Sequence, residues 1–251
     1  RMKITLGIGP FGQEAAEVAS AMMLPSETWS HCYGRSWGAF IGRGGSSKSV
    51  LDTFFGNPLE STIKEFLERK TFLHVVVGVQ LSHAVGTAWA YQLSRGENIP
   101  SIAYFGDGAT SEGYFHEALN WAAILRIPVI FFCENNQWAI STPAPLNTPP
   151  GMTLAERALG YGLHFEYIDG NDPFAVARAT QKALARGYER GESTLIEADT
   201  YRLGPHTTAA AEIIDIPREA KEKAIKEDPL PRLQRFLLSE EANELLGMDW
   251  S

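Results

Sequence analysis

The sequence lacks several features that would assign it quickly to a class. Only two of its 251 residues are cysteines, Cys32 and Cys133, so a disulfide framework is excluded and a reducing compartment such as the cytoplasm is expected. No apolar run approaches the ~20 residues that span a bilayer, and residues 1–4 show no signal-peptide pattern. Positive charge is also scarce, since 22 Lys and Arg stand against 30 Asp and Glu, a formal net charge of −8. This acidic balance favours neither nucleic acid nor a membrane as a partner.

Short apolar runs alternate with amphipathic stretches along the second half of the chain. Strands that are joined by helices in this order pair in parallel and are covered on both faces. We therefore predict an α/β fold with a doubly wound, mostly parallel sheet flanked by helices. The expected strands are 101–105, 128–133, 164–168 and 194–198, and the expected helices between them are 113–124, 153–160 and 173–188, the last capped by Asp172.

The remaining segments carry weaker patterns. Helices are expected over 13–24 and 81–93, a charged helix over 217–228 and a short amphipathic helix from Leu230 to Leu237. Glycine and serine over 34–48, four prolines over 143–150 and an exposed stretch over 204–211 predict loops. We expect a single domain over residues 1–251, with a helical extension that begins at about residue 212.

The stretch Gly7–Gly12 matches the G-x-G-x-x-G pattern of dinucleotide-binding loops. Such a loop requires a strand before it and a second strand that ends in an acid ~20 residues later. Residues 2–6 are barely long enough for the first strand, and residues 24–29 are polar and turn-like. A glycine-rich loop that leads into helix 13–24 is therefore favoured, and an NAD-dependent oxidoreductase is kept as the alternative.

Two polar motifs follow neighbouring expected strands. Gly106-Asp107-Gly108 comes directly after the first strand, and Asn135-Asn136 follows the next one after 26 intervening residues. Because the carboxyl ends of neighbouring parallel strands share one sheet edge, these side chains should lie close together, where doubly wound folds bind ligands. The glycines allow a phosphate to approach the backbone. One carboxylate, one amide oxygen, a backbone carbonyl and two diphosphate oxygens would suit Mg²⁺.

These motifs carry a family resemblance. The segment FGDGATSEGYFHEALNWAAILRIPVIFFCENNQWAISTP (105–143) resembles the alpha subunit of the thiamine-diphosphate-dependent decarboxylating component of 2-oxo acid dehydrogenase complexes. The resemblance extends over GYGLHFEYIDGNDPFAVARAT (160–180), TYRLGPHTT (200–208), GQEA (12–15) and VGVQLSHAVG (77–86). It implies a thiamine-diphosphate-binding fold and oxidative decarboxylation of a 2-oxo acid, followed by acyl transfer to a lipoyl group.

The resemblance also implies roles for individual residues. Mg²⁺ would be held by Asp107, Asn136 and the carbonyl of Trp138, and His206 would reach the cofactor and the substrate. The other residues implied to bind thiamine diphosphate are Tyr33, Arg35, Val75, Val77, Gly106, Gly108 and Ala109. His31 is a weaker candidate for the site, whereas structural or surface roles are expected for His74, His83, His116 and His164.

The partners are likewise implied by the resemblance. A beta subunit would complete an α2β2 heterotetramer and supply the glutamate that activates the cofactor, and a lipoyl-bearing acyltransferase core would accept the acyl group. The sequences of segments 160–172 and 200–203 favour a branched-chain 2-oxo acid over pyruvate as the substrate. Two departures stand out: Gly34 separates Tyr33 from Arg35, and three alanines follow Thr208 where the family carries acids. A non-catalytic assembly subunit of the same fold is the third alternative.

Overall fold

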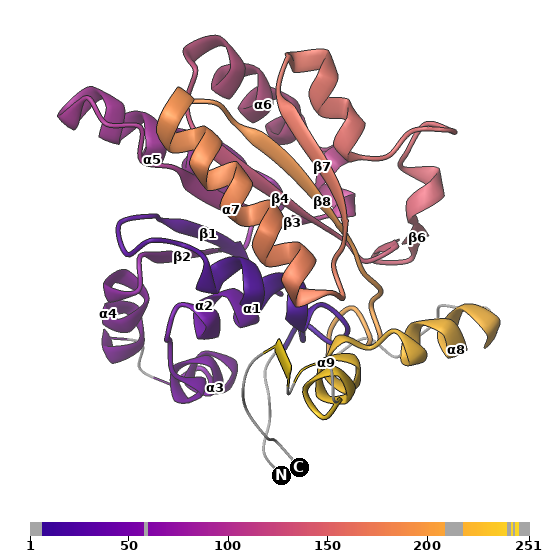
Figure 1. Cartoon of the computed structure of the whole chain (residues 1–251). Helices are drawn as coiled ribbons and strands as arrows, with labels where there is room; N and C mark the ends of the chain where they lie inside the picture. Colours follow the sequence, from indigo (N-terminus) through magenta and orange to yellow (C-terminus); the bar gives the residue numbers. More distant parts are fainter. Residues whose placement is uncertain (1–6, 58–59, 209–217, 240–241, 243, 246–251) are drawn as a thin grey trace.

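A single six-stranded sheet organises the chain, and all of its strands run in parallel (Figure 1). The computed structural model describes residues 7–57, 60–208, 218–239, 242, 244 and 245. The strand order is β2-β1-β3-β4-β8-β7, so the chain starts near the middle, moves to one edge and returns to build the other. The strands are β1 (Ser30–Tyr33), β2 (Thr71–His74), β3 (Ser101–Gly106), β4 (Val129–Asn135), β7 (His164–Asp169) and β8 (Thr194–Asp199).

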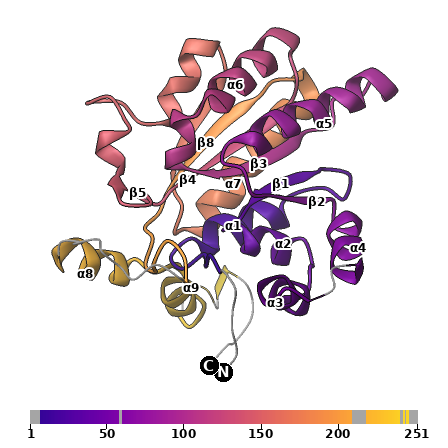
Figure 2. The same ribbon diagram turned by 180° about the vertical axis from the view of Figure 1, so that it is seen from behind.

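Helices cover both faces of this sheet. One face packs against α5 (Val79–Arg95), α6 (Gly113–Leu125) and the 3-10 segment η3 (Ala155–Tyr161), which Figure 2 shows in front. The other face packs against α1 (Glu14–Met22) and α7 (Pro173–Arg190), where Asp172 caps α7 by accepting hydrogen bonds from two backbone N–H groups. The predicted α/β fold with a parallel sheet flanked by helices is therefore confirmed.

Smaller elements complete the described part of the chain. Helices α8 (Arg218–Lys226) and α9 (Pro229–Leu237) lie beyond the carboxyl ends of β7 and β8 (Figure 1). The hairpin β5 (Trp138–Ala139) and β6 (Thr142–Pro143) follows β4. The other elements are α2 (Trp37–Gly42), α3 (Ser47–Phe55), α4 (Glu60–Glu68) and the 3-10 segments η1 (Asp107–Ser111) and η2 (Ala144–Leu146). No helix within the described ranges is long and apolar enough to cross a membrane.

The prediction of a loop over 34–48 is wrong, because this stretch contains α2 and the start of α3. Two of its glycines serve close helix packing instead of turns. A Cβ at Gly38 would lie 2.7 Å from Glu17 Oε2, and one at Gly42 would lie 2.9 Å from the Val18 carbonyl, so both glycines let α2 approach α1. Two strands, β1 and β2, escaped prediction because each has only four residues. In place of the helix expected over 153–160, the structure has the 3-10 segment η3 (Ala155–Tyr161).

Residues 7–12 form a loop that pairs with the distant segment 203–208. Gly7 N–H donates to Thr208 Oγ1 at 2.9 Å, and Thr208 N–H donates to the Gly7 carbonyl at 2.8 Å. Gly12 adopts φ +86°, and a Cβ there would lie 2.1 Å from the Tyr201 carbonyl. The glycines therefore serve a backbone-to-backbone approach. Residues 204–207 are half-buried by this pairing, so their predicted exposure is wrong; residues 2–6 and 209–211 lie outside the described part.

Candidate functional site

The two polar motifs meet at the carboxyl edge of the sheet. Strands β3 and β4 are neighbours, with Gly106 opposite Glu134 in the register. Asp107 follows β3 at once, and Asn136 follows β4 at once, so both residues leave the sheet at the same edge. A Cβ at Gly108 would lie 2.7 Å from the Cβ of Ala139, which shows that the segment after β4 packs directly on the segment after β3. The topology therefore brings both predicted motifs into one site.

Asp107 is a buried carboxyl group that is incompletely satisfied. Its side chain is 1% exposed, and its Oδ2 atom has no hydrogen-bond partner among the residues that the structure describes. Burial raises the pKa of Asp107 to about 6, because desolvation penalises the carboxylate more than Arg202 and Arg35 stabilise it. A buried oxygen without a partner costs free energy, which a bound cation at this position would offset.

Asn136 belongs to a buried hydrogen-bonded chain. Its Nδ2 donates to Gln13 Oε1 at 2.5 Å, and Gln13 Nε2 donates to Glu134 Oε2 at 2.7 Å. The Tyr33 hydroxyl also donates to Glu134 Oε2, at 2.8 Å. Gln13, Glu134 and Asn136 are all at most 4% exposed. These hydrogen bonds therefore fix the orientation of the Asn136 amide from the side of helix α1.

A second carboxyl group, Glu17, lies beside Glu134 beneath this network. Glu17 Oε2 accepts a hydrogen bond from Gly38 N–H at 2.6 Å. Burial raises the pKa of Glu17 well above its usual value, and the neighbouring Glu134 raises it further. Burial likewise raises the pKa of Glu134. Two adjacent buried carboxyl groups cannot both ionise at low cost, so the pair keeps a proton near neutral pH.

The Trp138 carbonyl, the third expected metal ligand, faces a buried arginine. Arg202 is 2% exposed, and its guanidinium donates to the carbonyl oxygens of Trp138 at 3.3 Å and Ile140 at 2.8 Å. The Arg202 backbone N–H also donates to the Asn136 carbonyl at 3.1 Å. These contacts hold the turn after β4 in place and bring a fixed positive charge beside the expected diphosphate position.

Arg35 and His206 meet at the other side of the site. Arg35 lies in the turn after β1, where its guanidinium donates to the His206 carbonyl at 3.2 Å and to the Gly9 carbonyl. Burial lowers the pKa of His206, and the positive charges of Arg35 and Arg202 lower it further. The neutral imidazole is therefore the dominant form near pH 7, and it can accept or donate a proton.

The remaining predicted residues occupy less definite positions. Ala109 is buried beside Asp107, and the Tyr33 hydroxyl lies 3.8 Å from where a Gly106 Cβ would be. Val75 and Val77 lie on the loop after β2 and are 92% and 57% exposed, so their proposed contact with a cofactor stays a prediction.

His31 forms a separate histidine cluster. His31 Nδ1 lies 3.2 Å from His74 Nε2, and the His74 ring packs edge-on against the His83 ring at 4.9 Å between centroids. The cluster lies under α5, where His31 Nε2 contacts Thr87 Oγ1 at 3.0 Å. Its residues contact one another and none of the site residues described above, which favours the structural role over the site role.

The donor set fits a hard cation. One carboxylate with an unpaired oxygen, one amide oxygen and one carbonyl oxygen match the ligands that Mg²⁺ prefers, with open positions for phosphate oxygens and water. Within the described ranges, no group of three or more His, Cys, Asp and Glu side chains is arranged to hold a metal ion. A site with a single carboxylate therefore needs the ligand's own oxygens to complete the coordination.

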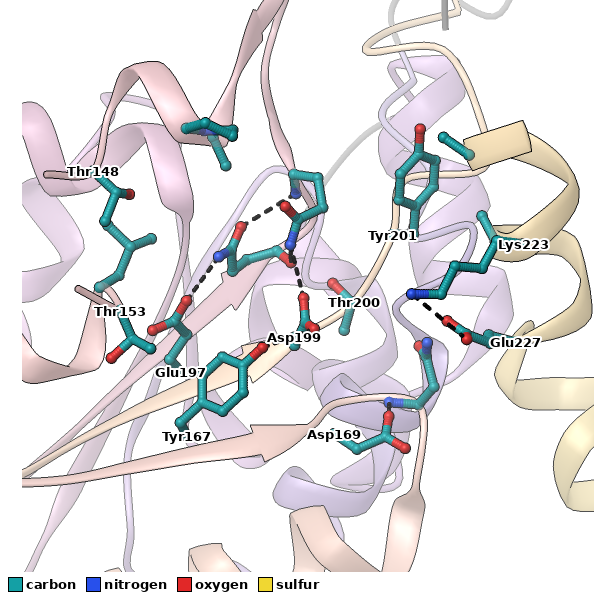
Figure 3. Close-up of a pocket in the computed structure, with 18 of the residues that line it drawn as sticks. Thr148, Thr153, Tyr167, Asp169, Glu197, Asp199, Thr200, Tyr201, Lys223 and Glu227 are labelled. Atoms are coloured by element: carbon teal, nitrogen blue, oxygen red, sulfur yellow. Dashed lines mark hydrogen bonds and ion pairs between the residues drawn. The ribbon is translucent and has the colours of Figure 1, made fainter. Parts of the chain in front are cut away.

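A pocket of about 1210 Å³ lies beside this site, beyond the ends of β7 and β8 (Figure 3). Asp199 and Thr200 line one wall, and Lys223 of α8 and Glu227 directly after it line the opposite wall (Figure 3). Asp199 accepts from Gln137 Nε2 at 2.7 Å and from the Tyr167 hydroxyl at 2.9 Å. This polar pocket borders the turn after β4 without including Asp107 or Asn136.

Four buried residues of the site were not anticipated from the sequence: Gln13, Glu17, Glu134 and Arg202. Glu134 carried a usable signal, since it is a charged residue at the end of the otherwise apolar run 128–133. Such residues are rarely buried unless they are paired. Gln13, Glu17 and Arg202 carried no comparable signal, because their burial depends on contacts between distant segments.

Comparisons with known proteins identify the family of the chain. Residues 1–244 match the model of the family described as dehydrogenase E1 component. The 3-methyl-2-oxobutanoate dehydrogenase subunit alpha of Mycobacterium tuberculosis is 39% identical over 90% of this chain and 61% of its own length. The pyruvate dehydrogenase E1 component subunit alpha of Acholeplasma laidlawii is 33% identical over 91% of this chain and 66% of its own length.

A solved structure shows the same fold. An enzyme isolated from Mycobacterium smegmatis and assigned thiamin diphosphate dependence superposes with a TM-score of 0.50 at 18% identity, covering 79% of this chain and 33% of that one. The chain thus spans less than two thirds of the length of these relatives.

Proposed function

Because the chain belongs to the dehydrogenase E1 component family, we propose that it serves as the alpha subunit of a 2-oxo acid dehydrogenase and binds thiamine diphosphate through Mg²⁺. The observation that carries this proposal is the position of Asp107 and Asn136 at one sheet edge, with Asp107 Oδ2 buried and without a partner among the described residues. Mg²⁺, bound together with the cofactor's diphosphate, would supply the missing partner.

The residues of this chain would bind and orient the cofactor. Asp107, Asn136 and the Trp138 carbonyl would hold Mg²⁺, and the backbone of Gly106, Gly108 and Ala109 would face the diphosphate. When bound, thiamine diphosphate supplies the nucleophilic carbon and the electron sink for decarboxylation. Arg35 would neutralise phosphate charge, while Tyr33, Val75 and Val77 would lie along the rest of the cofactor.

His206 is the proposed catalytic residue of this chain. Its lowered pKa keeps the imidazole neutral near pH 7, so it can donate a hydrogen bond to a substrate oxygen without adding a second cation beside Arg35. The Arg35 contact to the His206 carbonyl holds the 203–208 segment at the mouth of the site. The Phe11 carbonyl also holds this segment in place, because it accepts a hydrogen bond from Leu203 N–H at 3.0 Å.

A beta subunit is the proposed partner, in an α2β2 assembly that docks on a lipoyl-bearing acyltransferase core. The face made by α5 and α6 supports a large partner, because it exposes the neighbouring side chains Trp89 and Trp121, whose rings are 6.2 Å apart, together with Leu93 and Ile124. Leu93 and Ile124 are 71% and 70% exposed. Exposed aromatic and aliphatic side chains grouped in this way are typical of protein interfaces.

A branched-chain 2-oxo acid is the proposed substrate. The relative from Mycobacterium tuberculosis, named for 3-methyl-2-oxobutanoate, is more similar to this chain than the pyruvate dehydrogenase subunit from Acholeplasma laidlawii. The test is a substrate assay of the chain assembled with its beta subunit, with thiamine diphosphate and Mg²⁺. We expect a higher kcat/KM for 3-methyl-2-oxobutanoate than for pyruvate, and the reverse order would overturn the substrate assignment.

Thermal stabilisation separates this function from its alternatives. Thiamine diphosphate with Mg²⁺ should raise the Tm of the assembled protein, whereas NAD should leave it unchanged. Stabilisation by NAD alone would favour a dinucleotide-dependent oxidoreductase. No stabilisation by either ligand would favour a non-catalytic assembly subunit.

A further inference from the structure

The Asn136 amide is held by Gln13, a residue to which the sequence analysis assigned no role in the site. Gln13 precedes helix α1, and its own side chain does not cap the helix. Glu14, the first residue of α1, accepts from Gly12 N–H, in the turn before the helix, at 2.9 Å. The Gln13 side chain therefore reaches inward, where it bridges Asn136 and Glu134 while being fully buried.

The hydrogen bonds of this bridge set the direction of each amide. A glutamine or asparagine amide presents an oxygen on one side and an NH2 group on the other. Gln13 Nε2 donates to Glu134 Oε2, so the Gln13 oxygen must point towards Asn136. That oxygen accepts from Asn136 Nδ2, so Asn136 must point its oxygen away from α1. Among the residues that the structure describes, Asn136 Oδ1 then accepts only from Trp138 N–H, at 3.2 Å, and keeps a lone pair for another ligand.

If the Gln13 amide were reversed, its hydrogen bonds to Asn136 and to Glu134 would both be lost. Its NH2 group would face Asn136 Nδ2, and its oxygen would face Glu134 Oε2. Glu134 Oε2 is itself fixed as an acceptor by the Tyr33 hydroxyl at 2.8 Å. Because Gln13, Glu134 and Asn136 are all buried, water does not compensate for a lost hydrogen bond.

We propose that Gln13 is a positioning residue that orients the Asn136 amide so that Oδ1, and not Nδ2, faces the Mg²⁺ position. This inference rests on the proposed function, because it concerns a metal ligand of that site. Glu134 holds the other end of the Gln13 amide. Gly12 allows the turn that places Gln13, since only a residue without Cβ fits against the Tyr201 carbonyl there. Partners that orient metal ligands typically contribute 10–100-fold to metal affinity.

The test measures Mg²⁺ affinity in the chain assembled with its beta subunit. Mg²⁺ is titrated at saturating thiamine diphosphate, with tryptophan fluorescence as the readout, because Trp138 lies two residues from Asn136. Gln13→Met is expected to weaken the apparent Mg²⁺ affinity by about 10–100-fold. The matched control is Gln80→Met, which removes a glutamine that is also buried but donates to the Tyr104 carbonyl. The control should change Mg²⁺ affinity by less than about twofold.

A polarity swap separates orientation from packing. Gln13→Glu alone places two carboxyl groups against each other and should weaken Mg²⁺ binding. Adding Glu134→Gln restores a donor opposite an acceptor, with the Tyr33 hydroxyl turned to accept from the new NH2 group. The double variant should therefore recover most of the affinity. The swap also decides the matter if Gln13→Met fails to fold.

The outcomes distinguish this inference from the proposed function. Equal Mg²⁺ affinities for folded Gln13→Met and Gln80→Met would overturn the positioning role, as would a swapped pair that stays as weak as Gln13→Glu. If Asp107→Ala leaves Mg²⁺ affinity unchanged as well, the proposed function fails instead. If Asp107→Ala abolishes binding and Gln13→Met does not alter it, the inference alone is wrong.

Discussion

The guanidinium of Arg35 donates a hydrogen bond to the His206 carbonyl at 3.2 Å and lies 3.4 Å from His206 Nδ1, although the two residues are 171 positions apart in the chain. This contact joins the turn after β1 to the 203–208 segment across the candidate site. It places a permanent positive charge beside the imidazole that we propose acts in the reaction.

Removal of the Arg35 charge should raise the pKa of His206. Burial is the main cause of the lowered pKa, and Arg35 is the larger of the two charges that contribute. In Arg35→Gln the imidazole should therefore protonate at a higher pH than in the wild type, without returning fully to its ordinary value. NMR titration of the imidazole in the cofactor-free protein measures this shift. An unchanged or lowered pKa would show that the contact is absent in solution.

Addition of a single methyl group at Gly108 should disturb the site. A Cβ at this position would lie 2.7 Å from the Cβ of Ala139, so the turn after β4 must move away from the turn after β3. We expect Gly108→Ala to lose about 1–3 kcal/mol of unfolding free energy and to weaken cofactor binding. Gly113→Ala is the control, because nothing lies within 4 Å of its Cβ position. Urea unfolding of both variants checks this, and equal stabilities would contradict it.

The buried pair Glu17 and Glu134 should tolerate an amide better than a truncation. In Glu17→Gln the new amide oxygen can still accept from Gly38 N–H, so we expect a loss below about 1 kcal/mol. Glu17→Ala leaves that buried donor unpaired and should cost about 1–3 kcal/mol. Denaturant unfolding at pH 7 compares the two variants. The explanation would be wrong if the amide were as destabilising as alanine.

The same pair predicts a pH dependence of stability. A carboxyl group whose pKa is raised in the folded state binds more protons there than in the unfolded chain. The contribution of this pair to the unfolding free energy of the cofactor-free protein should therefore fall as the pH rises above about 4.5. Glu17→Gln removes one of these groups and should reduce this slope.

The histidine cluster should destabilise the fold in acid. Burial lowers the pKa of His31 to about 3 and that of His74 to about 4. The unfolded chain therefore binds more protons than the folded chain below pH 6.5, and stability falls as the pH falls through this window. His31 alone should cost on the order of 1–2 kcal/mol between pH 7 and pH 5. His31→Gln should reduce this loss of stability. The control His116→Gln, at an exposed position, should leave the loss of stability unchanged.

The sequence predicted the strand-end motifs well because they depend on local patterns. Apolar runs over 101–105 and 128–133 place the ends of β3 and β4, and the register of neighbouring parallel strands then brings Asp107 towards Asn136. The N-cap at Asp172 was equally local, since its side chain accepts from the N–H groups of Phe174 and Ala175.

Long-range contacts explain what the sequence did not reveal. The glycines of α2 predicted a loop because tight turns and close helix packing both use glycine. The packing of α1 against them distinguishes the two cases, and it is visible only in the structure. The partner of Asn136 lies 123 positions away at Gln13, and no periodicity connects them. The strands β1 and β2 are too short to show alternation; β1 pairs with the longer β3, and β2 pairs with β1.

Calorimetric titration of thiamine diphosphate into the assembled protein measures whether Asp107 and Asn136 jointly hold Mg²⁺ and the diphosphate. With Mg²⁺ present the wild type should bind, and Asp107→Ala and Asn136→Ala should each weaken binding by more than the roughly 10–100-fold typical of losing an indirect partner. Without Mg²⁺ the difference between wild type and variants should largely disappear. Wild-type affinity in both variants at saturating Mg²⁺ would contradict the account.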